Sequence, residues 1–342
     1  MPSSTQQESY IASPERGSIV VIVLIVLSAL AVLAVELSKE ILTDYASSTY
    51  LQSTVAGYAL FDSGKAIACD VLKKDYKNSK ADHQFEEWGK VNEVLVRISN
   101  EFESGDISGI IRDENSLFPI NRITSPDTTD AVAYREILLR LLTQLCHDLD
   151  IHHGKPQDFL DAIRIWQGEE LPDAISHDIW YQTRSKPYER PKKKLISPEE
   201  LLLIYWPNAQ LSDVERLYYG SKDVKGLHDL ITVWGNGPIN MNTACPEIIS
   251  AIPTEQRYRA AFLKAATAFR NNSKNSFANN WYLPLAEDIG LSQKQIPTRA
   301  LGVASDVFRI SITVTIGGSE LRECSIIKRT ADEISTIDSF AN

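Results

Sequence analysis

The 342-residue sequence predicts an α+β protein in which a long N-terminal helix covers an antiparallel sheet and a large all-α insertion separates the strands. Three observations predict this class. An apolar run, 19–35, continues into a segment without proline up to Pro119. Alternating apolar residues occur near residue 110 and again between residues 305 and 329. The stretch between them consists of short helical patterns, so the sheet is split in sequence.

The N-terminal pattern predicts one helix from residue 18 to about residue 76. Its apolar part spans roughly 26 Å at about 1.5 Å per residue, which is close to the thickness of a thin bilayer core. A signal peptide would end at a small-residue cleavage site, whereas here a helical pattern continues. Beyond the apolar part, residues such as Leu51 and Val55 recur at spacings of three and four. We therefore expect a membrane anchor followed by a helix with one apolar face to be covered.

The remaining elements follow in order. A short alternating run at 105–112 predicts a strand. From Asp130 to about Asn272, short helical segments alternate with turn residues and predict a compact all-α unit. The C-terminal part alternates again from Phe308 to Val314, and Gly317-Gly318 predicts the turn of a hairpin.

Composition excludes one class of partner and leaves the thiol chemistry open. The net charge of −10 and the pI near 5.2 argue against a nucleic-acid surface. The four cysteines lack any CxxC spacing, which disfavours zinc. If the chain beyond the anchor is in an oxidising compartment, one or two disulfides with three possible full connectivities are permitted, and buried free thiols are equally compatible. These residues are Cys69, Cys146, Cys245 and Cys324.

The residues just before the apolar helix resemble a known processing site. Arg16-Gly17 followed by an apolar helix resembles the processing site of prepilin-like proteins, in which a membrane peptidase cuts after the glycine. Ser18 would then be the new N-terminus, which is often methylated in that family. The fifth residue after the cut is Ile22, where most pilins and pseudopilins carry a glutamate. A subunit with nothing above it needs no such carboxylate, and this departure resembles the K-type minor pseudopilins of type II secretion.

Further segments resemble the same family in the same order along the chain. They are Asp82 with Glu87-Trp88, Asp113-Glu114-Asn115 with Asn121, Glu200 with the leucines after it, Ile239–Ala244, Ser305-Asp306 with Phe308, and Lys328-Arg329. The resemblance implies a pilin-like fold whose parts are a leader at 1–17, a transmembrane segment at 18–36, a periplasmic helix with the first strands at 37–125, a helical insertion at 126–280 and C-terminal strands at 281–342.

The resemblance also implies a function. K-type subunits cap or initiate the pseudopilus that drives protein export across the outer membrane. We therefore expect a non-enzymatic, single-pass inner-membrane protein with most of its chain in the periplasm. Its expected partners are the I-type and J-type minor pseudopilins, the inner-membrane secretion platform and the prepilin peptidase. Leu51 and Val55 are the expected assembly residues on the helix, together with Ile22.

Two further sets of residues carry more specific expectations. We expect Asn121, Asn240, Asn242 and Thr243 to tie loops together, with Asn242 or Thr243 capping the helix that begins near Pro246. The resemblance implies calcium as a candidate ligand, because K-type subunits bind calcium; Asp178 matches a family ligand, and Glu169 and Glu170 are candidate neighbours. Calcium takes six to eight oxygen ligands, and His177 departs from the family pattern as a poor ligand for a hard ion.

A histidine-rich segment supports an alternative. Cys146, His147, Asp148, Asp150, His152 and His153 crowd into eight positions, a density that suits either a transition metal or a solvated helix end. The alternative function is a single-pass, membrane-anchored periplasmic enzyme or metal-binding protein. No nucleophile-elbow, phosphate-loop or dinucleotide motif accompanies it.

Overall fold

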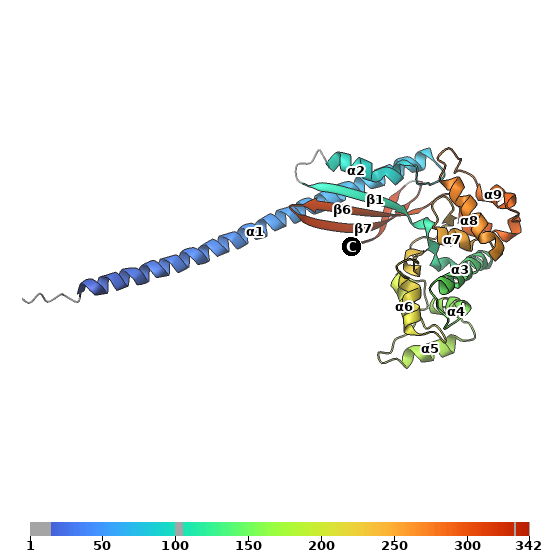
Figure 1. The fold of residues 1–342 in the computed structure, drawn as a ribbon, viewed down its shortest axis with the longest axis horizontal. Helices are drawn as coiled ribbons and strands as arrows, with labels where there is room; N and C mark the ends of the chain where they lie inside the picture. Colours follow the sequence, from blue (N-terminus) through green and yellow to red (C-terminus); the bar gives the residue numbers. More distant parts are fainter. Residues whose placement is uncertain (1–14, 100–104, 332, 342) are drawn as a thin grey trace, which may run out of the picture. The chain divides into compact units, whose positions relative to one another are not determined.

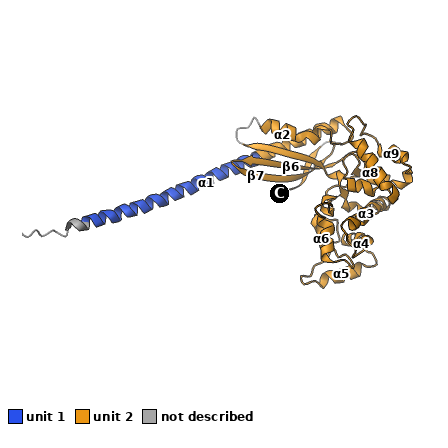
Figure 2. Cartoon of the chain, viewed as in Figure 1, with its two compact units in different colours: residues 1–59 blue, residues 60–342 orange. Residues whose placement is uncertain are grey.

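A computed structural model describes the backbone of residues 15–99, 105–331 and 333–341, with side chains from residue 19 to residue 340 in those ranges. The chain forms two compact units, residues 1–59 and residues 60–342 (Figure 2). Each unit is described by itself below.

Helix α1 (Glu15–Asn78) confirms the predicted N-terminal helix and extends it by a few residues at each end (Figure 1). It contains no proline, so nothing interrupts its backbone hydrogen bonds. In the described part of the chain, α1 is the one helix that is long and apolar enough to cross a membrane. Its large apolar residues between Ile19 and Tyr58 are exposed. The long apolar helix was thus predictable from composition and the absence of proline.

The main sheet has the strand order β1-β6-β7-β8, antiparallel throughout (Figure 1). Its strands are β1 (Asp106–Asp113), β6 (Val307–Ile316), β7 (Ser319–Arg329) and β8 (Ile334–Ala341). Gly317 and Gly318 form the predicted two-residue turn between β6 and β7, with φ angles of 56° and 82°. Positive φ at both positions suits glycine, because this turn matches the twist of the flanking strands. Strand β8 was not predicted.

One face of this sheet is covered by helices. The alternating residues Phe308, Ile310, Ile312 and Val314 of β6 are all buried, as their period of two predicts. They pack in one apolar cluster with the last part of α1, from Leu60 to Leu72, and with α2 (Val91–Ser99). The expectation of a long helix that covers an antiparallel sheet is confirmed for this part of α1.

Between β1 and β6 the chain forms the insertion. Its α-helices are α3 (Thr128–Asp148), α4 (Pro156–Trp166), α5 (Ala174–Gln182), α6 (Leu211–Tyr219), α7 (Pro246–Ala251), α8 (Gln256–Arg270) and α9 (Tyr282–Asp288). The 3-10 helices of the chain are η1 (Glu87–Lys90), η2 (Glu114–Ser116), η3 (Ile120–Thr124), η4 (Pro198–Leu203), η5 (Leu227–Asp229), η6 (Gln293–Gln295) and η7 (Thr298–Ala300). A single apolar core runs through this region, from Phe118 to Leu301.

The insertion also contains strands that the helical pattern did not predict. Strand β2 (Phe118–Pro119) pairs with β3 (Ile231–Thr232), and β4 (Ile239–Asn240) pairs with β5 (Leu301–Gly302); both pairs are parallel. The expectation that the unit from Asp130 to about Asn272 is all-α is therefore wrong at the short strands β3 and β4. Ile231 and Thr232 are β-branched and fully buried, and pairing with β2 satisfies their backbone groups inside the core.

Candidate assembly site and its polar scaffold

A buried carboxylate joins the sheet to the insertion. Asp113 is the last residue of β1 and is 4% exposed. Its carboxylate is the acceptor in every hydrogen bond described here. Its oxygens accept from the backbone N–H of Asn115 at 2.8 Å, Asn240 Nδ2 at 2.8 Å, Ser305 Oγ at 2.7 Å and the Thr243 hydroxyl. Burial raises the pKa of Asp113 to about 7, and the Ser305 and Thr243 hydrogen bonds oppose that rise. The buried position of Asp113 depends on these donors, because burying a carboxylate without hydrogen-bond partners costs free energy.

The segment Ile239–Ala244 extends this network to the C-terminal loops. Asn240 Nδ2 donates to the carbonyl of Asp82 at 3.0 Å. Asn242 Nδ2 donates to the carbonyls of Phe277 and Val303, each at 3.1 Å, while its Oδ1 accepts from Trp281 Nε1 at 2.7 Å. These amides hold together segments that lie far apart in the sequence.

The predicted cap of the following helix is wrong. The N-cap of α7 is Cys245, and no side chain caps it. Thr243 instead donates its hydroxyl to Asp113, and the amide of Asn242 is fully used by the loops described above. Both side chains therefore serve long-range contacts, which a local capping rule does not consider.

Asn121 has an equivalent tying role in the insertion. It is 3% exposed, and its Nδ2 donates to the carbonyls of Leu195 at 2.9 Å and Val233 at 3.1 Å. Its Oδ1 accepts from the amide of Leu195 at 2.9 Å. One side chain thus satisfies three buried backbone groups from two loops.

A second polar cluster links the end of α1 to the sheet. Arg329, at the end of β7, donates through Nη1 to Asp75 at 3.1 Å and to the carbonyl of Leu72 at 3.2 Å. Through Nη2 it donates to Asp82 and to the carbonyl of Ser305 at 3.0 Å. All three charged side chains are almost completely buried.

The carboxylates around Arg329 have raised pKa values. Burial, with the nearby charges of Glu86 and Asp82, raises the pKa of Asp75 to about 7 against the opposing effect of Arg329. Burial also raises the pKa of Asp82, and Arg329 opposes it. Asp75, Asp82 and Glu86 lie close enough to form a cation site, with ligand atoms within 4.8 Å of one another. The Arg329 guanidinium supplies the positive charge between the two aspartates.

The predicted assembly residues lie on α1 in the first unit. Leu51 is 61% exposed, Val55 is 68% exposed and Ile22 is 57% exposed. The expectation that an apolar stripe of α1 packs on the chain's own sheet is confirmed only from Leu60 onward, where apolar side chains of the helix are buried. Gly17 and Ser18 fall in the helical segment, and their side chains lie outside the described residues. The exposed stripe is apolar surface of the kind that marks a protein or membrane interface.

The three carboxylates expected for calcium are each engaged by arginine. Asp178 accepts from Arg190 Nε at 2.6 Å, and this hydrogen bond lowers the pKa of Asp178. Glu170 lies 3.4 Å from the same guanidinium, whereas Glu169 pairs with Arg135 and Arg164. These residues do not converge on one point as a group of metal ligands in the described part of the chain. Calcium would have to displace arginine here.

The side chains of the histidine-rich segment also do not meet at one point as metal ligands in the described part of the chain. His147 lies 3.1 Å from Asp148, His152 lies 2.8 Å from Asp150 and His153 lies 3.4 Å from Asp213. The three imidazoles are 85%, 78% and 57% exposed, and each lies next to a different carboxylate. This arrangement fits the solvated helix end better than a transition-metal site.

The cysteines form no disulfide in the described part of the chain. Cys69, Cys146 and Cys245 are free thiols, and Cys324 Sγ lies 3.1 Å from Ser311 Oγ. Burial raises the pKa of Cys146 to about 12, which keeps it a protonated, unreactive thiol.

A long apolar-to-amphipathic helix on an antiparallel sheet, with a helical domain inserted between the strands, defines a pilin-like fold with a large insertion. The chain is similar to a chain in the crystal structure of the GspK-GspI-GspJ complex from the enterotoxigenic Escherichia coli type 2 secretion system. The similarity has a TM-score of 0.58 at 16% identity and covers 86% of this chain and 99% of that chain. The fold is therefore GspK-like. No protein-family model and no curated protein matches the sequence.

Proposed function

We propose that the chain is a minor pseudopilin of a type II secretion system that caps or initiates the pseudopilus. The observation that carries the proposal is the GspK-like fold over nearly the whole of the matched chain. That neighbour belongs to a complex with GspI and GspJ, which supports I-type and J-type pseudopilins as partners of this chain. The exposed apolar face of α1, including Leu51 and Val55, offers the surface for such contacts.

The proposal includes a location and a processing step. Residues 18–36 would anchor the chain in the inner membrane, with the rest in the periplasm and with the secretion platform and prepilin peptidase as further partners. The peptidase would remove residues 1–17. The insertion, proposed as residues 126–280, has no enzymatic role in this scheme. The alternative is a membrane-anchored periplasmic enzyme or metal-binding protein, which needs no such processing.

Mass spectrometry of the purified N-terminus distinguishes these functions. We expect a chain that begins at Ser18, and we expect Gly17→Val to leave a longer, membrane-retained precursor that does not support secretion. The reason is that the helix cannot leave the bilayer while a polar leader is attached. Ser18→Thr, which leaves the glycine before the cut intact, is the matched control and should be processed. An intact Met1 start in the wild type, or normal secretion by Gly17→Val, would contradict the proposal.

The position in the filament gives a second test. A subunit in the shaft has neighbours above and below, and the large insertion would clash with them. The glutamate missing at Ile22 points the same way, because only the topmost subunit has no terminal amine above it to neutralise. We expect gold-labelled antibody against the insertion to decorate one end of the filament, and Ile22→Glu not to improve assembly. Labelling along the whole shaft would reject the tip position.

A further inference from the structure

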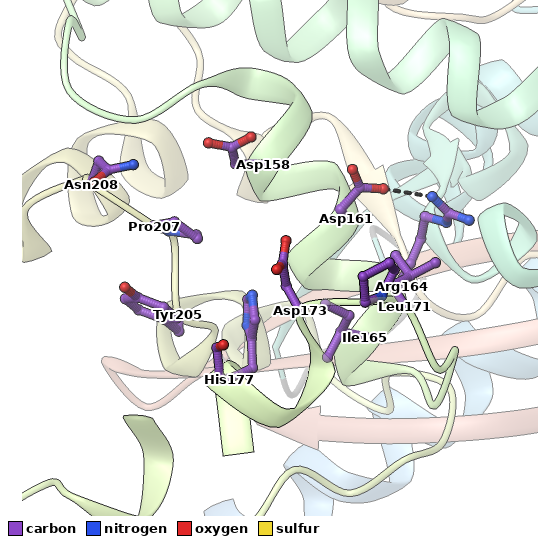
Figure 3. A pocket seen from close by; sticks show the side chains of 12 residues that line it. Asp158, Asp161, Arg164, Ile165, Leu171, Asp173, His177, Tyr205, Pro207 and Asn208 are labelled. Atoms are coloured by element: carbon purple, nitrogen blue, oxygen red, sulfur yellow. Dashed lines mark hydrogen bonds and ion pairs between the residues drawn. The ribbon is translucent and has the colours of Figure 1, made fainter. Parts of the chain in front are cut away.

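The insertion contains a cavity that the proposed assembly function does not use. It has a volume of about 600 Å³ and lies within the second unit. Figure 3 shows side chains around it from α4, from the segment that leads into α5 with the start of that helix, and from the segment 205–208. The cavity therefore brings together three parts of the insertion that are separated in sequence.

The lining is acidic, and part of its charge is unpaired. Asp158, Asp161 and Asp173 face a single lining cation, Arg164, among the described residues. Arg164 is already paired, because its guanidinium lies 2.5 Å from Asp161 and 2.7 Å from Glu169. The side chains of Asp158 and Asp173 make no hydrogen bond or ion pair with any described residue. Asp173 is even the N-cap residue of α5, yet its carboxylate does not cap the helix.

A buried imidazole lines the same cavity. His177 is 2% exposed, and its Nδ1 has no hydrogen-bond partner among the described residues. Figure 3 shows its ring between Asp173 and Tyr205. Burial lowers the pKa of His177, so the ring is neutral near pH 7 and offers one acceptor nitrogen. A buried polar group without a partner is uncommon and calls for a ligand or another explanation.

One side of the cavity is aromatic. The Tyr205 ring lies 5.1 Å from that of His177 and stacks on Trp180 at 4.5 Å, with an angle of 21° between the planes. Tyrosine rings attract a cation held over their face. The cavity thus combines unpaired carboxylates, an uncharged acceptor and an aromatic surface.

We propose that this cavity binds the guanidinium group of an arginine side chain carried by a polypeptide. Guanidinium is planar, stays charged and presents five donors, so it can meet Asp158, Asp173 and an imidazole nitrogen at once and still lie against an aromatic ring. A metal ion fits less well, because these residues do not place three ligand atoms within 4.8 Å of one another. Leu171, Pro172 and Pro207 supply apolar surface for the aliphatic stem of the side chain.

The first experiment measures binding to the full-length protein in detergent. The probes are N-acetyl-arginine methylamide, its uncharged citrulline counterpart and free arginine. Their binding is measured by saturation-transfer NMR and calorimetry. We expect the arginine derivative to bind about 10-fold more tightly than the citrulline derivative, because the pairs with both carboxylates are lost with the charge. Free arginine should bind more weakly than the derivative, since its own carboxylate meets an acidic wall.

Variants then assign the binding to this cavity. Asp173→Asn and His177→Phe should each weaken binding of the arginine derivative by about 3- to 10-fold. Glu215→Gln removes the same charge as Asp173→Asn from an exposed position of α6 outside the cavity and should leave binding unchanged. Thermal unfolding checks that His177→Phe is folded, and Asp173 is exposed enough for its variant to fold. The proposal would be overturned if the citrulline derivative bound as tightly as the arginine derivative, or if calcium bound and the arginine derivative did not. Unchanged binding of the arginine derivative to the Asp173→Asn variant would also overturn it. Tighter binding of free arginine would overturn its polypeptide part.

Discussion

Aspartate at positions 51 and 55 should abolish co-purification of the chain with I-type and J-type minor pseudopilins. Leu51 and Val55 are four residues apart on one face of α1, and both are exposed in the isolated chain. Burying two such side chains in a helix interface is worth about 3–6 kcal/mol, and a carboxylate in the same place adds a desolvation cost. We expect the affinity to fall more than about 100-fold, measured by pull-down from detergent-solubilised membranes.

The matched control for this pair is Thr49→Asp with Ser53→Asp. These positions have the same spacing, and each lies two residues, or about 200°, around the helix from its counterpart. They add the same charge to α1 while leaving the apolar stripe intact, so the complex should survive. If the Leu51 and Val55 variant co-purifies as well as this control, the stripe is not the interface.

Arg329→Met should be the most destabilising single substitution outside the apolar cores. The side chain is 2% exposed and is the cation between Asp75 and Asp82. Its removal leaves two buried carboxylates facing each other without a counter-charge, and breaking a buried pair in this way costs about 3–5 kcal/mol. We expect a matching loss of unfolding free energy for the full-length protein in detergent, measured by denaturant titration.

Two comparisons isolate the electrostatic cause. Lys328→Met removes a cation from the neighbouring, exposed position of the same strand and should change stability by less than about 0.5 kcal/mol. Adding Asp75→Asn and Asp82→Asn to Arg329→Met should restore part of the lost stability, since the repelling charges are removed. Similar stability of the Arg329 and Lys328 variants would show that the buried cluster does not support the fold.

The elements that could be predicted from the sequence have local signals. The apolar run and the absence of proline predicted α1, and the alternation from Phe308 to Val314 with Gly317-Gly318 predicted the β6-β7 hairpin. Strand β8 has no comparable signal. Its residues are mostly exposed, so no buried face imposes a period of two on them.

The polar scaffold could be predicted only in part. The importance of Asn121, Asn240 and Asn242 followed from a resemblance, and the structure gives their contacts. The role of Asp75 could not be found, because its partner Arg329 lies 254 residues away and no local pattern links them. The cavity beside His177 was missed for the same reason: its walls come from segments that meet only in the folded chain.

The split sheet has a consequence for the order in which this chain can fold. Glu114 and Arg309, which pair beside the β1-β6 ladder, are 195 residues apart. Closing so long a loop is slow and costs chain entropy. The insertion core needs no buried residue beyond Leu301, so it can form while β6 is still being synthesised. Until β6 is complete, strand β1 and the apolar face of α1 lack the strand against which they pack in the folded chain. A chain of this topology therefore has its longest aggregation-prone interval during its own synthesis, and a chaperone that shields α1 and β1 would act at that stage.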